Sequence, residues 1–211
     1  HPEHAGWLNL NYPEIMTVAL HSTECLDEVC AQADIMVLGP GLGKTQWAKQ
    51  LFLASMNKSL PKVLDADALN WMAELGVEKN EMHILTPHPA EAARLLKRTT
   101  RELQNNRFAA IGELVNSSGS TIVLKGCGSL IASPNLKSHI CTQGNPGMAT
   151  AGMGDVLSGT IAGLWGQGMT PEKAAVLGTC LHAKAGDMAA LNGERGMIAS
   201  DLMPFMRALL G

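Results

Sequence analysis

The chain has 211 residues, of which 46% are hydrophobic and 17% are charged, and its formal net charge is −3. This composition is typical of one globular domain with a buried core, and it excludes the basic surface that binds nucleic acids or acidic membranes. The core must be mainly aliphatic, because the sequence contains four Trp, three Phe and one Tyr beside twelve Met. No apolar run reaches about 18 residues, so the sequence predicts no membrane span.

The cysteines and the first residues of the chain bear on its cellular context. Five cysteines are present without a CxxC pair, and an odd number without regular spacing predicts reduced thiols in a cytoplasmic protein. The chain opens at His1-Pro2, without an initiator Met or a signal peptide. We therefore expect the native start to lie upstream.

Short apolar runs predict strands, and each run ends at a Gly, Asp or Pro cluster. These runs cover residues 35–38, 62–64, 82–85 and 121–124. Continuous apolar strands between helices indicate a parallel sheet that is covered on both faces. Residues 129–133 and 137–142 are predicted to form an antiparallel pair at the sheet edge, joined by a turn at Pro134-Asn135.

Helical patterns fill most of the chain between and after these strands. They cover residues 45–58, 67–75, 89–97, 100–117, 154–166, 171–191 and 199–210. Pro171 fits the first turn of its helix, with Thr170 as the N-cap. No repeat, linker or low-complexity tract interrupts the order, so we expect one α/β layer domain over residues 1–211.

Polar or glycine-rich loops follow the predicted strands. In parallel sheets covered by helices, ligands bind beyond the carboxyl ends of the strands. Five loops fall at this place, and their common edge predicts a single ligand-binding cleft. They cover residues 39–43, 65–67, 86–91, 125–129 and 144–155.

The first of these loops, Gly39-Pro-Gly-Leu-Gly-Lys-Thr45, is similar to a Walker A loop but is one residue short. Three residues separate its first Gly from Gly-Lys-Thr, where the motif needs four. Three interpretations stay open: a true phosphate loop, a structural turn between strand and helix, and a glycine loop that lets a flat ligand approach the backbone.

The strongest signal lies in the last loop, where Gly152-Met153-Gly154-Asp155 leads into a helix. Unpaired amides at a helix N-terminus that contains glycines form an anion site. Asp155 falls in the first turn, where the helix dipole favours its carboxylate. A simple helix cap would explain the Asp but not the long glycine-rich approach from Gly144.

Five segments of the chain resemble, in order, those of the nucleotide-dependent NAD(P)H-hydrate dehydratases. The resemblance covers essentially residues 34–210, and its segments are 39–43, 63–70, 85–91, 123–126 and 144–159. It implies the ribokinase-like three-layer α/β/α fold with a mainly parallel central sheet. That family has further βα units before the strand at 35–38, so we expect the domain to be N-terminally incomplete in this chain. Ala151 stands where many relatives have Gly.

The resemblance implies a role for each matched residue. Asp155 is the catalytic base that faces the hydroxyl group of the hydrated dinucleotide, and Gly43 and His88 contact the same substrate. The phosphates and adenosine of the nucleotide are held by residues of two loops, namely Lys125, Gly126, Cys127, Gly128, Ser129, Gly152 and Gly154. Glu91 places Mg²⁺ through water. Two other interpretations stay open: His88 as a surface histidine between two prolines, and Lys125 as a solvated charge at a strand end.

The implied reaction is the dehydration of hydrated NADH or NADPH with ADP or ATP as the phosphoryl donor. Phosphate is a far better leaving group than hydroxide, and the ring nitrogen then expels it. A kinase of the same fold that phosphorylates a vitamin-precursor alcohol is the alternative, and a non-catalytic nucleotide-binding module is a third. We also expect a homo-oligomer, because charged residues are scarce, and an epimerase domain upstream in the same polypeptide.

Overall fold

The computed structural model describes residues 1–8, 10, 12–76 and 79–211. Within them, six strands form one sheet in the order β1 to β6. Strands β1 to β4 run parallel, whereas β5 and β6 are each antiparallel to the preceding strand. The strands are Met36–Leu38 (β1), Lys62–Leu64 (β2), His83–Leu85 (β3), Thr121–Leu124 (β4), Ser129–Ser133 (β5) and Leu136–Cys141 (β6).

The sheet agrees with the sequence prediction. The parallel strands, their order and the antiparallel edge pair are confirmed, and the turn between β5 and β6 falls at Pro134-Asn135. The predicted and observed strand ends differ by one residue at most. Strand ends commonly shift by this amount because terminal hydrogen bonds are weak.

Helices occupy the stretches between the strands and the C-terminal part of the chain. They are Pro2–Ala5 (α1), Leu26–Cys30 (α2), Gln46–Met56 (α3), Ala66–Leu75 (α4), Pro89–Leu95 (α5), Thr100–Asn105 (α6), Arg107–Ser118 (α7), Met153–Gly166 (α8), Pro171–Ala189 (α9) and Met203–Leu210 (α10). Short 3₁₀ turns cover Thr23–Cys25, Pro146–Met148, Ala190–Asn192 and Ala199–Leu202. The Thr170 hydroxyl accepts a hydrogen bond from Lys173 N at 3.4 Å, which confirms the predicted cap of α9.

The prediction of one helix over residues 100–117 is wrong, because the chain breaks at Asn106 into α6 and α7. Asn106 has φ −149° and ψ 77°, outside the helical region. Its side-chain oxygen accepts a hydrogen bond from Ala109 N at 3.0 Å and so caps α7. An Asn side chain competes with the helix backbone for such donors, which explains the break. Two further predicted helices, 171–191 and 199–210, are confirmed except for one 3₁₀ turn each, after α9 and before α10.

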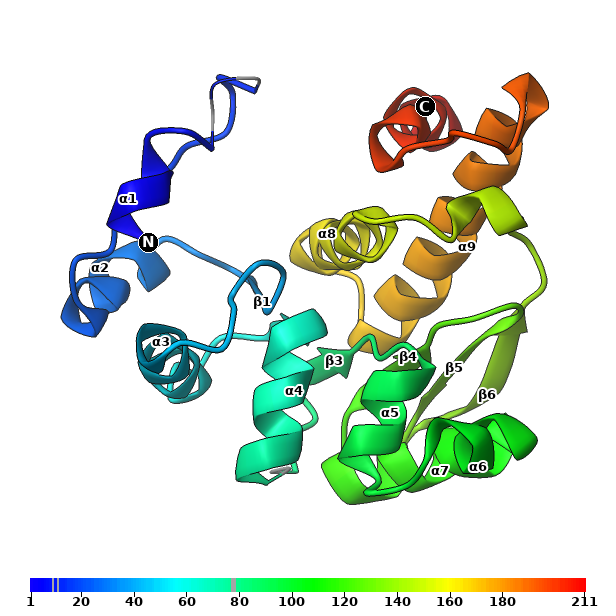
Figure 1. Cartoon of the computed structure of the whole chain (residues 1–211), viewed down its shortest axis with the longest axis horizontal. Coiled ribbons are helices and arrows are strands. Elements are labelled where there is room, and N and C mark those ends of the chain that lie inside the picture. Colours follow the sequence, from blue (N-terminus) through cyan, green and yellow to red (C-terminus); the bar gives the residue numbers. More distant parts are fainter. Residues whose placement is uncertain (9, 11, 77–78) are drawn as a thin grey trace.

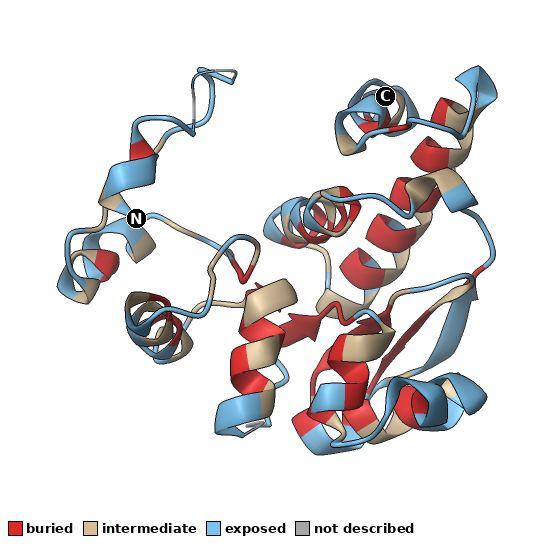
Figure 2. Ribbon diagram, viewed as in Figure 1, coloured by how far each residue is buried: buried red, intermediate tan, exposed pale blue. Residues whose placement is uncertain are grey.

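Helices cover both faces of the sheet and make three layers (Figure 1). On one face, Leu64, Leu85 and Leu124 pack against helices α3 to α7. On the other, Val63 and Val123 pack against α8 and α9. Each fully buried aliphatic side chain of this kind contributes about 1.5–3 kcal/mol. Strands β2 to β5 accordingly form the buried centre of the molecule in Figure 2, whereas most of the edge strand β6 is exposed.

A third apolar cluster holds the C-terminal helix in place. Met206 of α10 and Leu202 pack with Met153 of α8 and with Leu181 of α9. The first turn of α8 is therefore fixed by a core of its own. This matters for function because that turn carries the predicted anion site.

Candidate active site

Three polar residues, two of them buried, follow adjacent parallel strands and meet at one edge of the sheet. Asp65 follows β2, Thr86 follows β3 and Lys125 follows β4. Thr86 N donates a hydrogen bond to Leu64 O at 3.1 Å, and Lys125 N donates to Pro87 O at 2.9 Å, so the backbone pairing extends beyond the strand ends. The carboxyl edge of the sheet thus brings together residues that lie up to 60 positions apart in the sequence.

Asp65 is the centre of this arrangement, and its side chain is only 1% exposed. Its Oδ1 accepts a hydrogen bond from Lys125 Nζ at 2.7 Å and one from Ala66 N at 2.9 Å. Its Oδ2 accepts from Ser158 Oγ at 2.8 Å. A buried carboxylate needs a paired charge and several donors, and Asp65 has both. Sequence reasoning did not select Asp65, although its place directly after a buried strand was visible.

Ser158 and Thr86 connect α8 to the strand ends. Both residues are fully buried. Their hydroxyl oxygens lie 3.3 Å apart, and Thr86 Oγ1 donates to Leu64 O at 3.3 Å. Hydroxyl groups that bridge buried carbonyl and carboxylate oxygens leave few polar atoms without a partner. These bonds fix the start of α8 against the sheet.

The N-terminus of α8 faces the Lys125 ammonium group. A Cβ atom at Gly154 would lie 3.2 Å from Lys125 Nζ and 3.5 Å from Asp65 Oδ2. Gly152, the N-cap residue, has φ +84°, a conformation that glycine adopts at low cost. The first turn therefore combines unpaired backbone amides, the positive end of the helix dipole and a lysine. Such a combination attracts phosphate.

Asp155 lies in the first turn of α8, directly after Gly154. It is exposed, and among the described residues its carboxylate forms no hydrogen bond or ion pair. The side chain differs in this from Asp65, whose two oxygens are occupied. The Asp155 carboxylate is thus free to accept a proton from a ligand at the helix N-terminus.

His88 caps α5 and contacts Glu91. Its Nδ1 accepts hydrogen bonds from Ala90 N at 3.1 Å and Glu91 N at 3.4 Å, which places the proton of the neutral ring on Nε2. The pKa of His88 is lowered by burial and then by the charges of Lys125 and Arg94, which favours this neutral form. His88 is therefore a helix cap with a half-exposed ring, not a freely solvated histidine.

Glu91 is held in the first turn of α5, with 6% of its side chain exposed. Its Oε2 accepts a hydrogen bond from His88 N at 2.7 Å and lies 4.0 Å from Lys125 Nζ. Its Oε1 lies 3.3 Å from His88 Nε2. Burial raises the pKa of Glu91, opposed by the His88 backbone bond and the Lys125 charge. His88, Glu91, Lys125 and Asp65 thus form one connected polar group.

The Arg107 side chain holds the glycine loop over residues 125–129 in place. Arg107 was not identified as a site residue from the sequence. Arg107 Nη1 donates to Cys127 O at 2.8 Å and Nη2 donates to Leu124 O at 3.2 Å. Gly126 has φ +147°, and a Cβ there would lie 3.0 Å from Arg107 Nη2. The positive φ, together with the guanidinium group packed against this position, explains the glycine. The Ser129 hydroxyl donates to Gly126 O at 3.2 Å and closes the loop.

The glycine loop over residues 39–43 packs against the next strand end. A Cβ at Gly39 would lie 1.8 Å from Asp65 O, so only glycine fits there. Gly43 N donates to Asp67 Oδ2 at 2.9 Å, and Trp71 Nε1 donates to Gly43 O at 3.1 Å. The Thr45 hydroxyl caps α3 by accepting from Ala48 N at 3.2 Å. With Gly43 N and the Thr45 hydroxyl engaged inside the protein, the geometry favours a structural turn over a phosphate loop.

The long approach to α8 is held by Asp187 of α9. Its Oδ2 accepts from Gly144 N at 3.0 Å, and its Oδ1 accepts from Asn145 Nδ2 at 3.1 Å. Asn145 Oδ1 in turn accepts from Gly147 N at 3.1 Å. These bonds order a glycine-rich segment that has little apolar burial of its own. The predicted anion site is thereby tied to α9.

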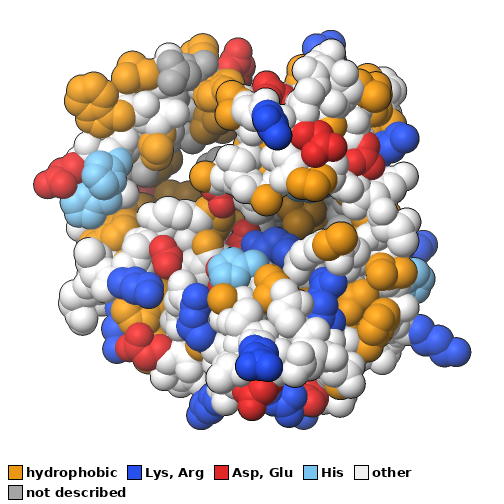
Figure 3. Space-filling model, turned by 45° about the vertical axis from the view of Figure 1, so that its right-hand side comes forward, with side chains coloured by type: hydrophobic (Ala, Val, Ile, Leu, Met, Phe, Trp, Pro, Cys, Tyr) orange, Lys and Arg blue, Asp and Glu red, His pale blue; other side chains and the backbone are white. Residues whose placement is uncertain are grey.

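Figure 3 shows a recess in the middle of one face, where histidine, basic and acidic side chains gather. Within the described ranges, no group of three or more His, Cys, Asp or Glu residues could by itself hold a metal ion. No described helix is long and apolar enough to cross a membrane.

Comparison with known proteins identifies the family. The NAD(P)H-hydrate dehydratase family model matches residues 2–207. The chain belongs to this family. It is 44% identical over 210 residues to the bifunctional NAD(P)H-hydrate repair enzyme Nnr of Coxiella burnetii, covering 99% of the chain and 43% of that protein. It is 38% identical to the ADP-dependent (S)-NAD(P)H-hydrate dehydratase of Neisseria meningitidis, covering 94% of the chain and 69% of that protein.

Solved structures agree with this assignment. A ribokinase-like superfamily protein of Enterococcus faecalis superposes with a TM-score of 0.83 at 30% identity, covering 97% of the chain and 72% of that protein. The ADP/ATP-dependent NAD(P)H-hydrate dehydratase of Bacillus subtilis, co-crystallised with ATP and Mg²⁺, gives a TM-score of 0.72 at 27% identity. The match covers 84% of the chain and 64% of that protein. The predicted ribokinase-like fold is confirmed. The chain spans about two fifths of the length of the Nnr proteins that it matches.

Proposed function

We propose that the chain carries out the nucleotide-dependent dehydration of hydrated NADH and NADPH. The observation that carries the proposal is the free carboxylate of Asp155 beside the anion site at the N-terminus of α8. Family membership supports the choice of substrate, as do the names of the relatives from Neisseria and Bacillus.

The chemistry requires two steps. In the first, the substrate hydroxyl oxygen attacks the terminal phosphorus of the nucleotide, and its proton passes to the Asp155 carboxylate. The bond from that phosphorus to the bridging oxygen breaks, and the shortened nucleotide leaves with the bonding electrons. The amides of α8 and the Lys125 ammonium stabilise the oxygens of the transferring group. Such transition states are loose, so positioning and electrostatics contribute more than base strength. In the second step, the ring nitrogen donates its lone pair, the carbon–oxygen bond breaks, and phosphate leaves with the bonding electrons. The neighbouring ring carbon then loses a proton to solvent, which restores the ring double bond of the reduced nicotinamide.

The two substrates occupy opposite sides of Asp155 in this proposal. Gly43, His88 and Asp155 contact the hydrated dinucleotide. The nucleotide is held by the backbone and side chains of Lys125, Gly126, Cys127, Gly128, Ser129, Gly152 and Gly154. Two contacts support the nucleotide side: Arg107 fixes the 125–129 loop, and Lys125 Nζ lies against the first turn of α8. Asp65 acts as a positioning residue, because it holds the ammonium group.

Mg²⁺ would be held mainly by the nucleotide phosphates and by water. Both oxygens of Asp65 are already bound to protein donors, so direct coordination by Asp65 does not fit. Glu91 Oε1 has a single polar contact, with His88 Nε2 at 3.3 Å, and it fits an ion bound through water. Mg²⁺ commonly keeps several waters in this way. When bound, the ion neutralises charge on the nucleotide phosphates.

The names of two relatives support the choice of phosphoryl donor. The Neisseria protein is named as ADP-dependent and the Bacillus protein as ADP/ATP-dependent, so we propose that either nucleotide serves. We further propose a cytoplasmic homo-oligomer, together with an epimerase domain in the same polypeptide, as the bifunctional name of the Nnr relatives supports.

The direct test is a repair assay. The protein is incubated with purified hydrated NADH and either ADP or ATP, and the near-ultraviolet absorbance of reduced nicotinamide is followed together with phosphate release. The proposal predicts nucleotide-dependent recovery of the absorbance, with one phosphate released for each NADH formed. Transfer of phosphate without recovery would instead indicate a kinase that stops at the phosphorylated product.

A further inference from the structure

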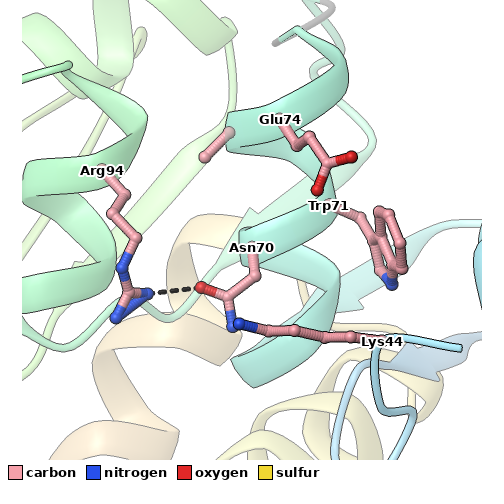
Figure 4. A pocket seen from close by; sticks show the side chains of 6 residues that line it. Lys44, Asn70, Trp71, Glu74 and Arg94 are labelled. Atoms are coloured by element: carbon pink, nitrogen blue, oxygen red, sulfur yellow. Dashed lines mark hydrogen bonds between the residues drawn. The ribbon is translucent and has the colours of Figure 1, made fainter.

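A separate pocket of about 340 Å³ lies beside the glycine loop over residues 39–43. It opens between α4 and α5, and Figure 4 shows the side chains that line it. These residues are Lys44, Asn70, Trp71, Ala73, Glu74 and Arg94. We call it the Lys44–Arg94 pocket. Neither the catalytic carboxylate nor the proposed nucleotide loops contribute to it.

Two cations face this pocket without partners of opposite charge. Among the described residues, neither Lys44 nor Arg94 forms an ion pair. Glu74 also lines the pocket, but in Figure 4 its carboxylate points towards Trp71 and away from Arg94. Two unpaired cations on the wall of a cavity are typical of a site for a phosphate group.

Arg94 is positioned rather than freely mobile. Its Nη1 donates to Asn70 Oδ1, as the dashed line in Figure 4 marks. Asn70 Nδ2 donates to Asp67 Oδ1 at 3.1 Å, and Asp67 Oδ2 accepts from Gly43 N at 2.9 Å. This chain of hydrogen bonds connects the guanidinium group to the glycine loop. The other nitrogens of Arg94 remain available for a ligand, because one N–H group satisfies Asn70.

The pocket continues from the side of the site that we assign to the dinucleotide. Lys44 follows Gly43 directly, and Arg94 lies one helical turn beyond Glu91 on α5, the helix that His88 caps. The charge of Arg94 also helps to lower the pKa of His88, after burial and Lys125. The proposed nucleotide loops lie elsewhere, after β4 and at the start of α8.

We propose that Lys44 and Arg94 bind a phosphate group of the hydrated dinucleotide, remote from the ring that reacts. This inference rests on the proposed function and deepens it. A phosphate contact remote from the reacting ring is the same in the ground state and the transition state, so it lowers KM and leaves kcat nearly unchanged. The phosphate is either the 2′-phosphate that distinguishes NADPH from NADH, or the diphosphate that both share.

The test compares Lys44→Ala and Arg94→Ala with the control Arg101→Ala, which removes an exposed cation from α6 outside the pocket. Each pocket variant should raise KM for the hydrated dinucleotide by roughly 5- to 50-fold, with kcat and the nucleotide KM changed little. An effect on hydrated NADPH alone identifies the 2′-phosphate, and an equal effect on both substrates identifies the diphosphate. An unchanged KM for both, or a raised nucleotide KM instead, overturns the proposal.

A second readout does not depend on turnover. Calorimetric titration with oxidised NADP and NAD, which do not react, should show the same losses of affinity in Lys44→Ala and Arg94→Ala. Glu74→Gln, which removes the one negative charge on the pocket wall, should bind more tightly than the unmodified protein. If the repair assay fails while these shifts appear, the dehydratase function falls but the phosphate pocket stands. Equal affinities in all variants would overturn the pocket itself.

Discussion

Replacing Asp65 by Asn tests the buried charge network that organises the site. Removing one partner of a buried ion pair costs about 3–5 kcal/mol, because the other charge is left uncompensated. The Lys125 side chain is 20% exposed and partly hydrated, so we expect a smaller cost, about 2–3 kcal/mol. Lys125→Met should lower the free energy of unfolding at least as much, since it leaves the Asp65 carboxylate, only 1% exposed, without its charged partner.

The assay is urea unfolding at pH 7 without ligands, followed by circular dichroism. The double variant Asp65→Asn/Lys125→Met should lose less stability than the sum of the single changes, with a coupling of about 1.5–3 kcal/mol. Asp187→Asn is the matched control. Asp187 accepts two hydrogen bonds but forms no ion pair in the described structure, so its change should cost about 1 kcal/mol or less. Additive effects, or a cost below about 1 kcal/mol for Asp65→Asn, would refute the network.

Two further predictions concern stability. Gly39→Ala should lower the free energy of unfolding by more than about 2 kcal/mol, because its Cβ would lie 1.8 Å from Asp65 O. Gly41→Ala, with nothing within 4 Å of the added Cβ, should lower it by only about 1 kcal/mol in the same urea titration. Similar losses in the two variants would contradict the close approach at Gly39. His83 is 2% exposed, and burial followed by the Lys62 charge lowers its pKa from 6.5 to about 4. The stability that neutral His83 contributes above about pH 6.5 is lost as the pH falls towards 4. In His83→Leu, the free energy of unfolding should therefore fall by on the order of 3 kcal/mol less than in the unmodified protein over this pH range. Parallel plots of unfolding free energy against pH for the two proteins would refute this.

The order of the elements could be predicted from the sequence because each signal is local. Apolar runs such as 62–64 and 121–124 mark buried strands, and glycine or polar clusters mark their ends. A parallel sheet then places all those ends at one edge, which is why the site loops were found together. The break at Asn106 was missed because an Asn at this position can either continue the helix or accept a hydrogen bond from Ala109 N with its side chain and start a new helix. The local sequence pattern does not decide between the two.

The partners within the site could not be predicted in the same way. Asp65 and Lys125 lie 60 residues apart, and neither local pattern specifies that they pair. Arg107 was missed for a similar reason, since it reaches the 125–129 loop from the start of α7. Lys125 was expected to contact nucleotide phosphates, and the structure adds that its ammonium group is already oriented by Asp65. The phosphate contact itself stays a prediction.

The central claim is that Asp155 accepts the proton of the substrate hydroxyl at the N-terminus of α8. The most direct measurement is the repair assay on hydrated NADH with Asp155→Asn, beside calorimetric titration of the nucleotide. The variant should keep the fold and its nucleotide affinity, because Asp155 is exposed and its carboxylate contacts no other described side chain. Its turnover should fall by about 10²- to 10⁴-fold. Full turnover in the purified variant would contradict the claim.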